Sequence, residues 1–174
     1  QSGKSESVNC LEWNIRTEDI HNLYTYNGHL FACGDFDGIL CYNLKDKSIR
    51  TIRILCNEND YKQPNIQEIR YIKDNRFAIS NTRFLYEMEF EGDDYTKDKV
   101  DINRKVQYER QFEKLIRNRI TNLHYDNDNE VLWVGTYGNG LVKINVSQSY
   151  AFQINLPDEI YHINDIVQDA DGYI

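Results

Sequence analysis

The chain has 174 residues, of which 40% are hydrophobic and 28% charged, and its net charge is −8. This length and composition suit a single globular domain with a sizeable core. The acidic balance argues against binding to a nucleic-acid backbone, which requires clusters of Lys and Arg. No run approaches the roughly 18 apolar residues of a membrane span, and no signal peptide is visible.

Thirteen tyrosines and only two prolines favour β-strands, in which aromatic rings pack on a pleated surface. The four cysteines, Cys10, Cys33, Cys41 and Cys56, include no CxxC pair, which argues against a zinc site. We expect buried free thiols on strands. Disulfide pairing stays open, because an even number of cysteines also fits an oxidising compartment.

A short pattern recurs four times along the chain. Each copy opens with two aliphatic residues three positions apart and continues as strand, turn, strand, turn and strand. The copies begin at Ile20, Ile66, Ile120 and Ile163, which are 46, 54 and 43 residues apart. This spacing matches propeller blades of roughly 40–50 residues. The sequence therefore predicts an all-β fold, a β-propeller fragment of about three and a half blades of four-stranded antiparallel sheets.

The repeat also predicts where each blade begins and ends. The expected limits are residues 1–16 for the end of a preceding blade or a closing strand, 17–62 for a first blade, 63–118 for a degenerate blade, 119–160 for the next blade and 161–174 for the start of a further one. Propeller blades bury their apolar faces only against neighbours. We therefore expect the chain to be a fragment of a longer protein, and to self-associate or be unstable if it ends at Ile174.

The opening strand of each copy carries aliphatic residues at positions i and i+3, such as Ile20 and Leu23. Positions three apart lie on opposite faces of a regular strand, because side chains alternate. Both faces are therefore predicted to be apolar, as an inner blade strand between two neighbours requires. Asn27-Gly28 next predicts a hairpin turn that needs positive φ.

A charged insertion follows the second copy, between Glu91 and Arg119, and accounts for the longest spacing. Two interpretations stay open for it: a short amphipathic helix over residues 105–117, or an outer strand followed by a long loop. Residues 104–119 hold six Lys and Arg, but Glu109 and Glu113 are interleaved. This pattern indicates a solvated face rather than an anion site.

The third copy runs through Leu132-Trp133-Val134-Gly135-Thr136 to Gly140-Leu141, and residues 164–174 read like the opening of another copy. These motifs resemble the two-component-regulator propeller repeat. The first copy departs from that repeat with Ala32 in place of its Trp and Asp35 in place of its Thr. The second has Ala78 in place of Trp, and Ser80-Asn81 in place of Gly-Thr.

This resemblance implies a periplasmic ligand sensor, often for oligosaccharides, in a bacterial hybrid two-component receptor. Its kinase and response regulator would lie elsewhere, its membrane contact would be made by other parts of the chain, and the full receptor would be a homodimer. The sequence does not identify the ligand. A protein-interaction propeller without a small ligand stays open, as does, with less support, a propeller lyase or hydrolase.

Several side chains have a functional and a structural interpretation. Trp133 could stack on a sugar, but its place in mid-strand predicts a wedge between blades, and Trp13 is expected in the strand before the first blade. The acidic pairs Asp126/Asp128 and Asp169/Asp171 lack the further ligands of a calcium loop, which favours hairpin turns.

The four histidines, His21, His29, His124 and His162, form no regular ring of ligands. His21 and His124 are expected near the propeller axis. No nucleophile elbow, phosphate-binding glycine loop or metalloprotease motif is present. We therefore predict no catalytic residue, no metal and no cofactor. The loops at residues 35–37 and 136–139 are the candidate ligand-binding loops at one end of the axis.

Overall fold

The computed structural model describes residues 15–55, 65–81, 85–90, 95, 99–101, 119–147, 150–154, 156 and 163–174. Within these ranges the chain contains β-strands and one 3-10 turn, η2 (Thr17–Asp19), and no α-helix. The strands are β1 (Ile20–Tyr26), β2 (His29–Gly34), β3 (Ile39–Asn43), β4 (Ile49–Leu55), β5 (Glu68–Lys73), β6 (Arg76–Ser80), β7 (Leu85–Glu89), β8 (Lys99–Asp101), β9 (Ile120–Asp126), β10 (Val131–Thr136), β11 (Leu141–Asn145) and β12 (Tyr150–Ile154).

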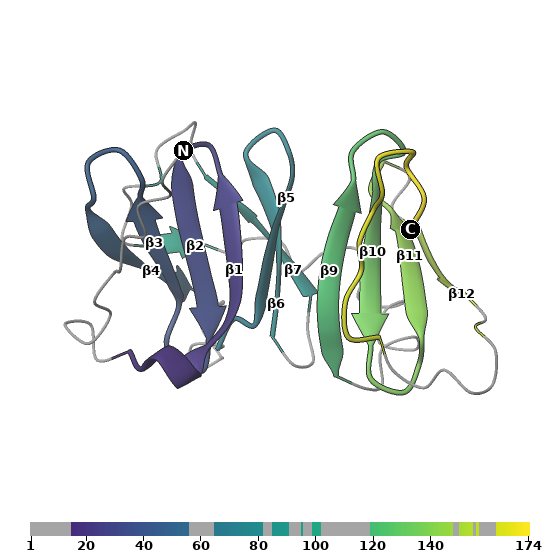
Figure 1. Cartoon of the computed structure of the whole chain (residues 1–174), viewed down its shortest axis with the longest axis horizontal. Coiled ribbons are helices and arrows are strands. Elements are labelled where there is room, and N and C mark those ends of the chain that lie inside the picture. Colours follow the sequence, from purple (N-terminus) through teal and green to yellow (C-terminus); the bar gives the residue numbers. More distant parts are fainter. Residues whose placement is uncertain are drawn as a thin grey trace, which may run out of the picture.

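The strands form three sheets in chain order, and each sheet is an antiparallel meander (Figure 1). The first joins β1 to β4, the second β5 to β7, and the third β9 to β12. Strands β1 and β9 run in the same direction in Figure 1, so the sheets are repeated units. The predicted all-β propeller architecture is confirmed.

Strand β8 departs from the expected four-stranded pattern. It follows β7 in the chain, yet it pairs in parallel with β4 of the first sheet, where Ile54 lies opposite Val100. The first sheet therefore has five strands and the described part of the second has three. This pairing covers part of the edge of β4, which would otherwise expose unpaired backbone groups. The helix considered at residues 105–117 lies outside the described residues.

The sheets stack side by side, with β5 packed between β1 and β9. One hydrophobic cluster joins the first and second sheets and includes Phe31, Ile69 and Phe77. Another joins the second and third sheets and includes Ala78 and Leu132. Successive residues Phe77 and Ala78 thus contact opposite neighbours, because strand side chains alternate. This two-sided burial is how a propeller blade is stabilised by its neighbours.

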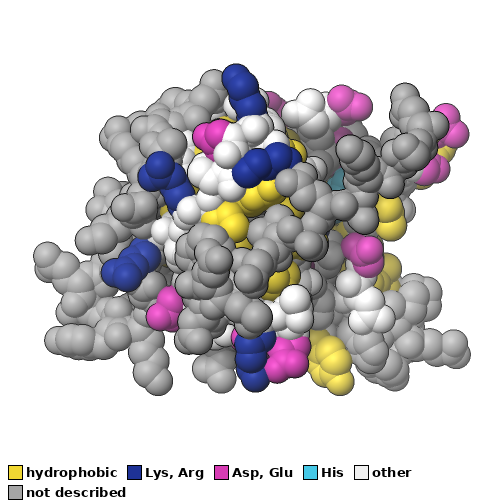
Figure 2. Space-filling model, turned by 60° about the vertical axis from the view of Figure 1, so that its left-hand side comes forward, with side chains coloured by type: hydrophobic (Ala, Val, Ile, Leu, Met, Phe, Trp, Pro, Cys, Tyr) yellow, Lys and Arg dark blue, Asp and Glu magenta, His cyan; other side chains and the backbone are white. Residues whose placement is uncertain are grey.

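A third, smaller cluster lies on the outer face of the first sheet, where Ala32 and Leu40 pack with Ile15. Figure 2 turns this side of the molecule forward and shows hydrophobic side chains among Lys, Arg and acidic groups. Leu23 also stays 60% exposed. The outer face of the first sheet therefore has the apolar character of a blade face.

The prediction that the i and i+3 aliphatic residues occupy opposite faces is wrong. Ile120 and Leu123 share the cluster between the second and third sheets, and Ile66 and Ile69 share the one between the first and second. Register shifts at the strand starts explain this for β9, since its pairing with β10 slips between Gly135 and Thr136. A bulge changes the phase of the alternation by one residue. In the second copy, Ile66 precedes the strand.

The turn chemistry agrees with the sequence. Asn27 and Gly28 both have positive φ, at 45° and 74°, as the predicted two-residue hairpin requires. Asp126 Oδ1 accepts hydrogen bonds from the backbone of Asp128 and Asn129, each at 3.1 Å. Asp169 Oδ1 accepts from the backbone of Asp171 and Tyr173. These carboxylates therefore cap their own turns.

The fourth copy, residues 163–174, forms no strand in the structure. It crosses the third sheet in Figure 1, and the backbone N–H of Ile163 donates to Thr136 O at 3.1 Å. Gly135 leaves room for it, because a Cβ there would lie 2.8 Å from the Ile163 side chain. The blade limits expected from the sequence stay predictions.

Candidate functional site

The first strand of each sheet, namely β1, β5 or β9, is its inner strand. These three inner strands begin at the same end of the stacked sheets. At that end, the backbone N–H of Asp35 donates to Asp19 O, and that of Tyr137 donates to Arg119 O, each at 2.8 Å. The loops that follow β2 and β10 therefore take equivalent positions beside the entries to β1 and β9. Both candidate loops, residues 35–37 and 136–139, lie at this end, which we call the axial end.

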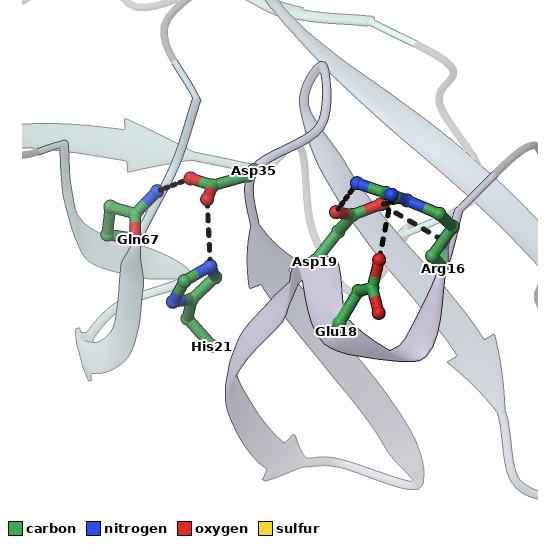
Figure 3. A network of polar contacts seen from close by, with 6 residues as sticks. All are labelled: Arg16, Glu18, Asp19, His21, Asp35 and Gln67. Carbon is green, nitrogen blue, oxygen red and sulfur yellow. Dashed lines mark hydrogen bonds and ion pairs between the residues drawn. The ribbon is translucent and has the colours of Figure 1, made fainter.

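Asp35 is the centre of a polar network at the axial end (Figure 3). Its Oδ2 lies 3.0 Å from His21 Nε2, and its Oδ1 accepts a hydrogen bond from Gln67 Nε2 at 2.9 Å. Gln67 belongs to the second copy, so this network joins the first two sheets. The Asp35 side chain is still 56% exposed, which leaves it open to a ligand.

Two ion pairs of Arg16 lie beside that network, at the start of the first strand. Arg16 contacts Glu18 at 2.7 Å and Asp19 at 2.8 Å, and Figure 3 shows the three side chains at the turn η2. The hydrogen bond from Arg16 lowers the pKa of Asp19. These exposed contacts orient the chain before β1 and contribute little to stability.

A second polar junction lies further along the inner strands. Arg70 of β5 donates to Asn22 of β1 at 3.1 Å, and its guanidinium lies 3.4 Å from the carboxyl group of Glu68. The guanidinium also lies over the Tyr24 ring, 5.2 Å from its centroid. Glu68 is buried, and this desolvation raises its pKa to about 7. Arg70 thus links the first and second sheets at their inner strands.

The third sheet makes the corresponding contacts with residues 163–174. Asn122 Nδ2 donates to Asp165 Oδ1 at 3.1 Å, and the Thr121 hydroxyl donates to the carbonyl of Ile163. His124 Nε2 lies 3.4 Å from Gln168 Oε1. The inner strands β1 and β9 are therefore each connected by polar side chains to the next segment around the axis.

Trp133 is half-buried and lies opposite His124 on β9, which itself contacts Gln168. Lys143 lies over its ring, 5.4 Å from the centroid. Backbone pairing corrects the repeat alignment: Leu23 faces Ala32, whereas Leu123 faces Val134. The structural counterpart of Trp133 in the first copy is therefore Phe31, not Ala32, because the Asp126 turn is two residues longer. Phe31 is fully buried between sheets.

The histidines do not gather into one site. His21 lies at the axial end, and His29 bonds the carbonyl of Asn27 at 2.9 Å in the first hairpin. His124 contacts Gln168, while His162 and Trp13 lie outside the described residues. No three His, Cys, Asp or Glu side chains of the described ranges come together as metal ligands. In the same ranges no helix is long and apolar enough to cross a membrane.

Cys33 and Cys41 are free, buried thiols on β2 and β3, and Cys10 and Cys56 lie outside the described residues. Burial raises the pKa of both thiols, that of Cys41 to about 12. In a variant with Cys10→Ser and Cys56→Ser, we expect the native protein to react with a disulfide reagent at pH 8 roughly a hundredfold more slowly than the denatured protein. Release of the coloured thiol product measures both rates, and fast labelling of the native protein would contradict this placement.

The two loops and His21 lie at the end that the sequence predicts, whereas Gln67, Glu68 and Arg70 were not predicted. These three follow Ile66 in the degenerate copy, and their partners are far away in the chain. The one feature of the sequence that could have indicated them is that these three polar residues adjoin the aliphatic pair at the start of an inner strand.

Comparison with known proteins agrees with this architecture. The family described as two component regulator propeller matches residues 114–138, which include β9, β10 and the first two residues of the loop after it. A search of curated protein sequences finds no significant match.

Two solved structures from B. thetaiotaomicron have a similar fold. The extracellular domain assigned to the one component system BT4673 is 16% identical, with a TM-score of 0.57 over 88% of this chain. The extracellular domain assigned to the hybrid two component system BT3049 is also 16% identical, with a TM-score of 0.55 over 95% of this chain. The chain spans 19% and 20% of those two structures. It therefore carries a two component regulator propeller repeat within an all-β propeller fragment.

Proposed function

We propose that this chain is part of the extracytoplasmic, ligand-sensing propeller of a two-component signalling receptor. The matched repeat at residues 114–138 is the observation that carries this proposal. The likeness to two extracellular propeller domains supports a location outside the cytoplasm, in the periplasm. Kinase activity and control of transcription would belong to other parts of a homodimeric receptor, and this chain would bind rather than catalyse.

The axial end is the proposed ligand site. Its loops come from two sheets and carry groups suited to a polyhydroxylated molecule. Asp35 offers an exposed carboxylate, and Tyr137 offers an aromatic ring that is 57% exposed. Carboxylates accept hydrogen bonds from sugar hydroxyls, and aromatic rings stack on the apolar faces of sugars. An oligosaccharide is therefore the proposed ligand class.

We expect Tyr137→Ala to weaken oligosaccharide binding about five- to tenfold, because it removes a stacking surface without opening the core. An oligosaccharide panel screened by thermal shift finds the ligand, and calorimetry measures its affinity. Tyr173→Ala is the matched control, since Tyr173 is also exposed, at 75%, but lies beyond the Asp169 turn.

Equal losses in the two variants would reject Tyr137 as a contact. Turnover of a panel member would indicate an enzyme instead. If the longer receptor responds to no oligosaccharide, and this chain instead binds a protein partner, the interaction-propeller hypothesis replaces this one.

A further inference from the structure

A buried carboxyl group lies at the junction of the second and third sheets. The Glu68 side chain is only 9% exposed, and it accepts a hydrogen bond from the backbone N–H of Leu123 on β9. Its Oε2 has no hydrogen-bond partner among the described residues, although Arg70 lies 3.4 Å away. An unpaired buried carboxylate oxygen is costly, and protonation is the simplest way to remove the charge.

The groups around Glu68 come from every sheet. Its own strand contributes the Arg70 cation, β2 contributes the neutral Cys33 thiol, and residues 163–174 contribute the Asp165 carboxylate. Ser80 of β6 pairs with Glu68, and its buried hydroxyl has no described partner. Asn122 of β9 precedes Leu123, and its buried Oδ1 also has no described partner. A neutral Glu68 carboxyl has an O–H that can be donated to an acceptor such as a hydroxyl or amide oxygen, whereas an ionised carboxylate has no hydrogen to donate.

The direction in which the pKa of Glu68 is shifted follows from these surroundings. Burial, and secondarily the charge of Asp165, raise the pKa of Glu68 from 4.5 to about 7, while Arg70 opposes the shift. The native protein therefore keeps a proton that the unfolded chain loses above pH 4.5. The contribution of protonated Glu68 to the stability of the native state is complete below pH 4.5 and is lost as the pH rises through about 7.

We propose that the protonation state of Glu68 controls the attachment of residues 163–168 to β9. The neutral carboxyl favours this attachment, and ionisation weakens it. The proton passes to solvent, and the negative charge left on Glu68 then opposes that of Asp165. Asp165 is held to β9 by the 3.1 Å bond from Asn122, and Thr121 holds Ile163 beside it. Displacing residues 163–168 separates the two carboxylates, so this segment is the element that the charge biases.

Hydrogen exchange measured by mass spectrometry tests whether the attachment of residues 163–168 depends on pH. After correction for intrinsic exchange rates, we expect the protection of residues 163–168 to fall about fivefold or more between pH 5.5 and 8.0. Glu68→Gln should remove this dependence and retain protection at pH 8.0, because the amide stays neutral. Glu89→Gln is the matched control, since Glu89 is exposed at the end of β7, and it should behave like the wild type.

Asp165→Asn provides a second variant that keeps the side-chain shape. It should reduce the pH effect, because the repulsion is removed while an amide can still pair with Asn122. A ¹³C titration of glutamate carboxyl groups gives a direct reading, in which the resonance missing from Glu68→Gln should titrate near pH 7. Titration of that resonance below pH 5.5 would overturn the proposal. So would equal protection of residues 163–168 at both pH values in the wild type, or an unchanged pH effect in Glu68→Gln.

Discussion

Replacing Gly34 by alanine is expected to destabilise the protein by about 3 kcal/mol or more. A Cβ at this position would lie 1.8 Å from the Asp19 carbonyl oxygen, which is a backbone atom and cannot rotate away. Gly34 pairs with Ile20 at the start of the inner strand, and the next residue, Asp35, bonds the same Asp19 oxygen. The added methyl would therefore separate β1 from β2 at the axial end. Urea denaturation followed by circular dichroism measures the loss.

Gly28→Ala is the control for that substitution. Gly28 has a φ of 74°, but a Cβ there would meet nothing within 4 Å. Only backbone strain remains, so we expect a loss of about 1 kcal/mol. Similar losses in the two variants would show that the Asp19 carbonyl does not constrain position 34.

Phe77→Ala is expected to cost about 3–5 kcal/mol, because Phe77 fills the space between the first two sheets. The side chain is fully buried. Its ring makes edge contacts with Tyr26 at 5.5 Å, Tyr71 at 5.5 Å and Phe90 at 5.4 Å between centroids. The substitution removes a ring contacted from both sheets, so the near-ultraviolet circular dichroism should also decrease. The midpoint of urea denaturation measures the change in stability.

Two further variants separate this packing effect from a general loss of aromatic surface. Phe77→Leu keeps most of the volume and should cost less than half as much as Phe77→Ala. Phe152→Ala, at a ring that is 40% exposed, should cost about 1 kcal/mol or less. A Phe77→Ala loss as small as that of Phe152→Ala would contradict the proposed junction between the sheets.

The axial end could be predicted in part. Residues 35–37 and 136–139 were found from the sequence because the repeat places a glycine-flanked turn after its second strand. The network that Asp35 makes was not predictable, since Gln67 lies 32 positions further along the chain. The contact between Arg70 and Asn22 spans 48 positions. Such pairings depend on which sheets become neighbours, and local periodicity does not encode that.

The sequence by itself determined the recurring antiparallel meanders, since turn residues and alternating apolar positions act over a few residues. Asn27-Gly28 specified its hairpin, and the spacing of Ile20, Ile66 and Ile120 specified the repeat. Only the tertiary structure decided the bulges that bring Ile120 and Leu123 to one side, and the attachment of β8 to β4. It also decided the burial of Glu68, because desolvation arises only when neighbouring sheets close around a side chain.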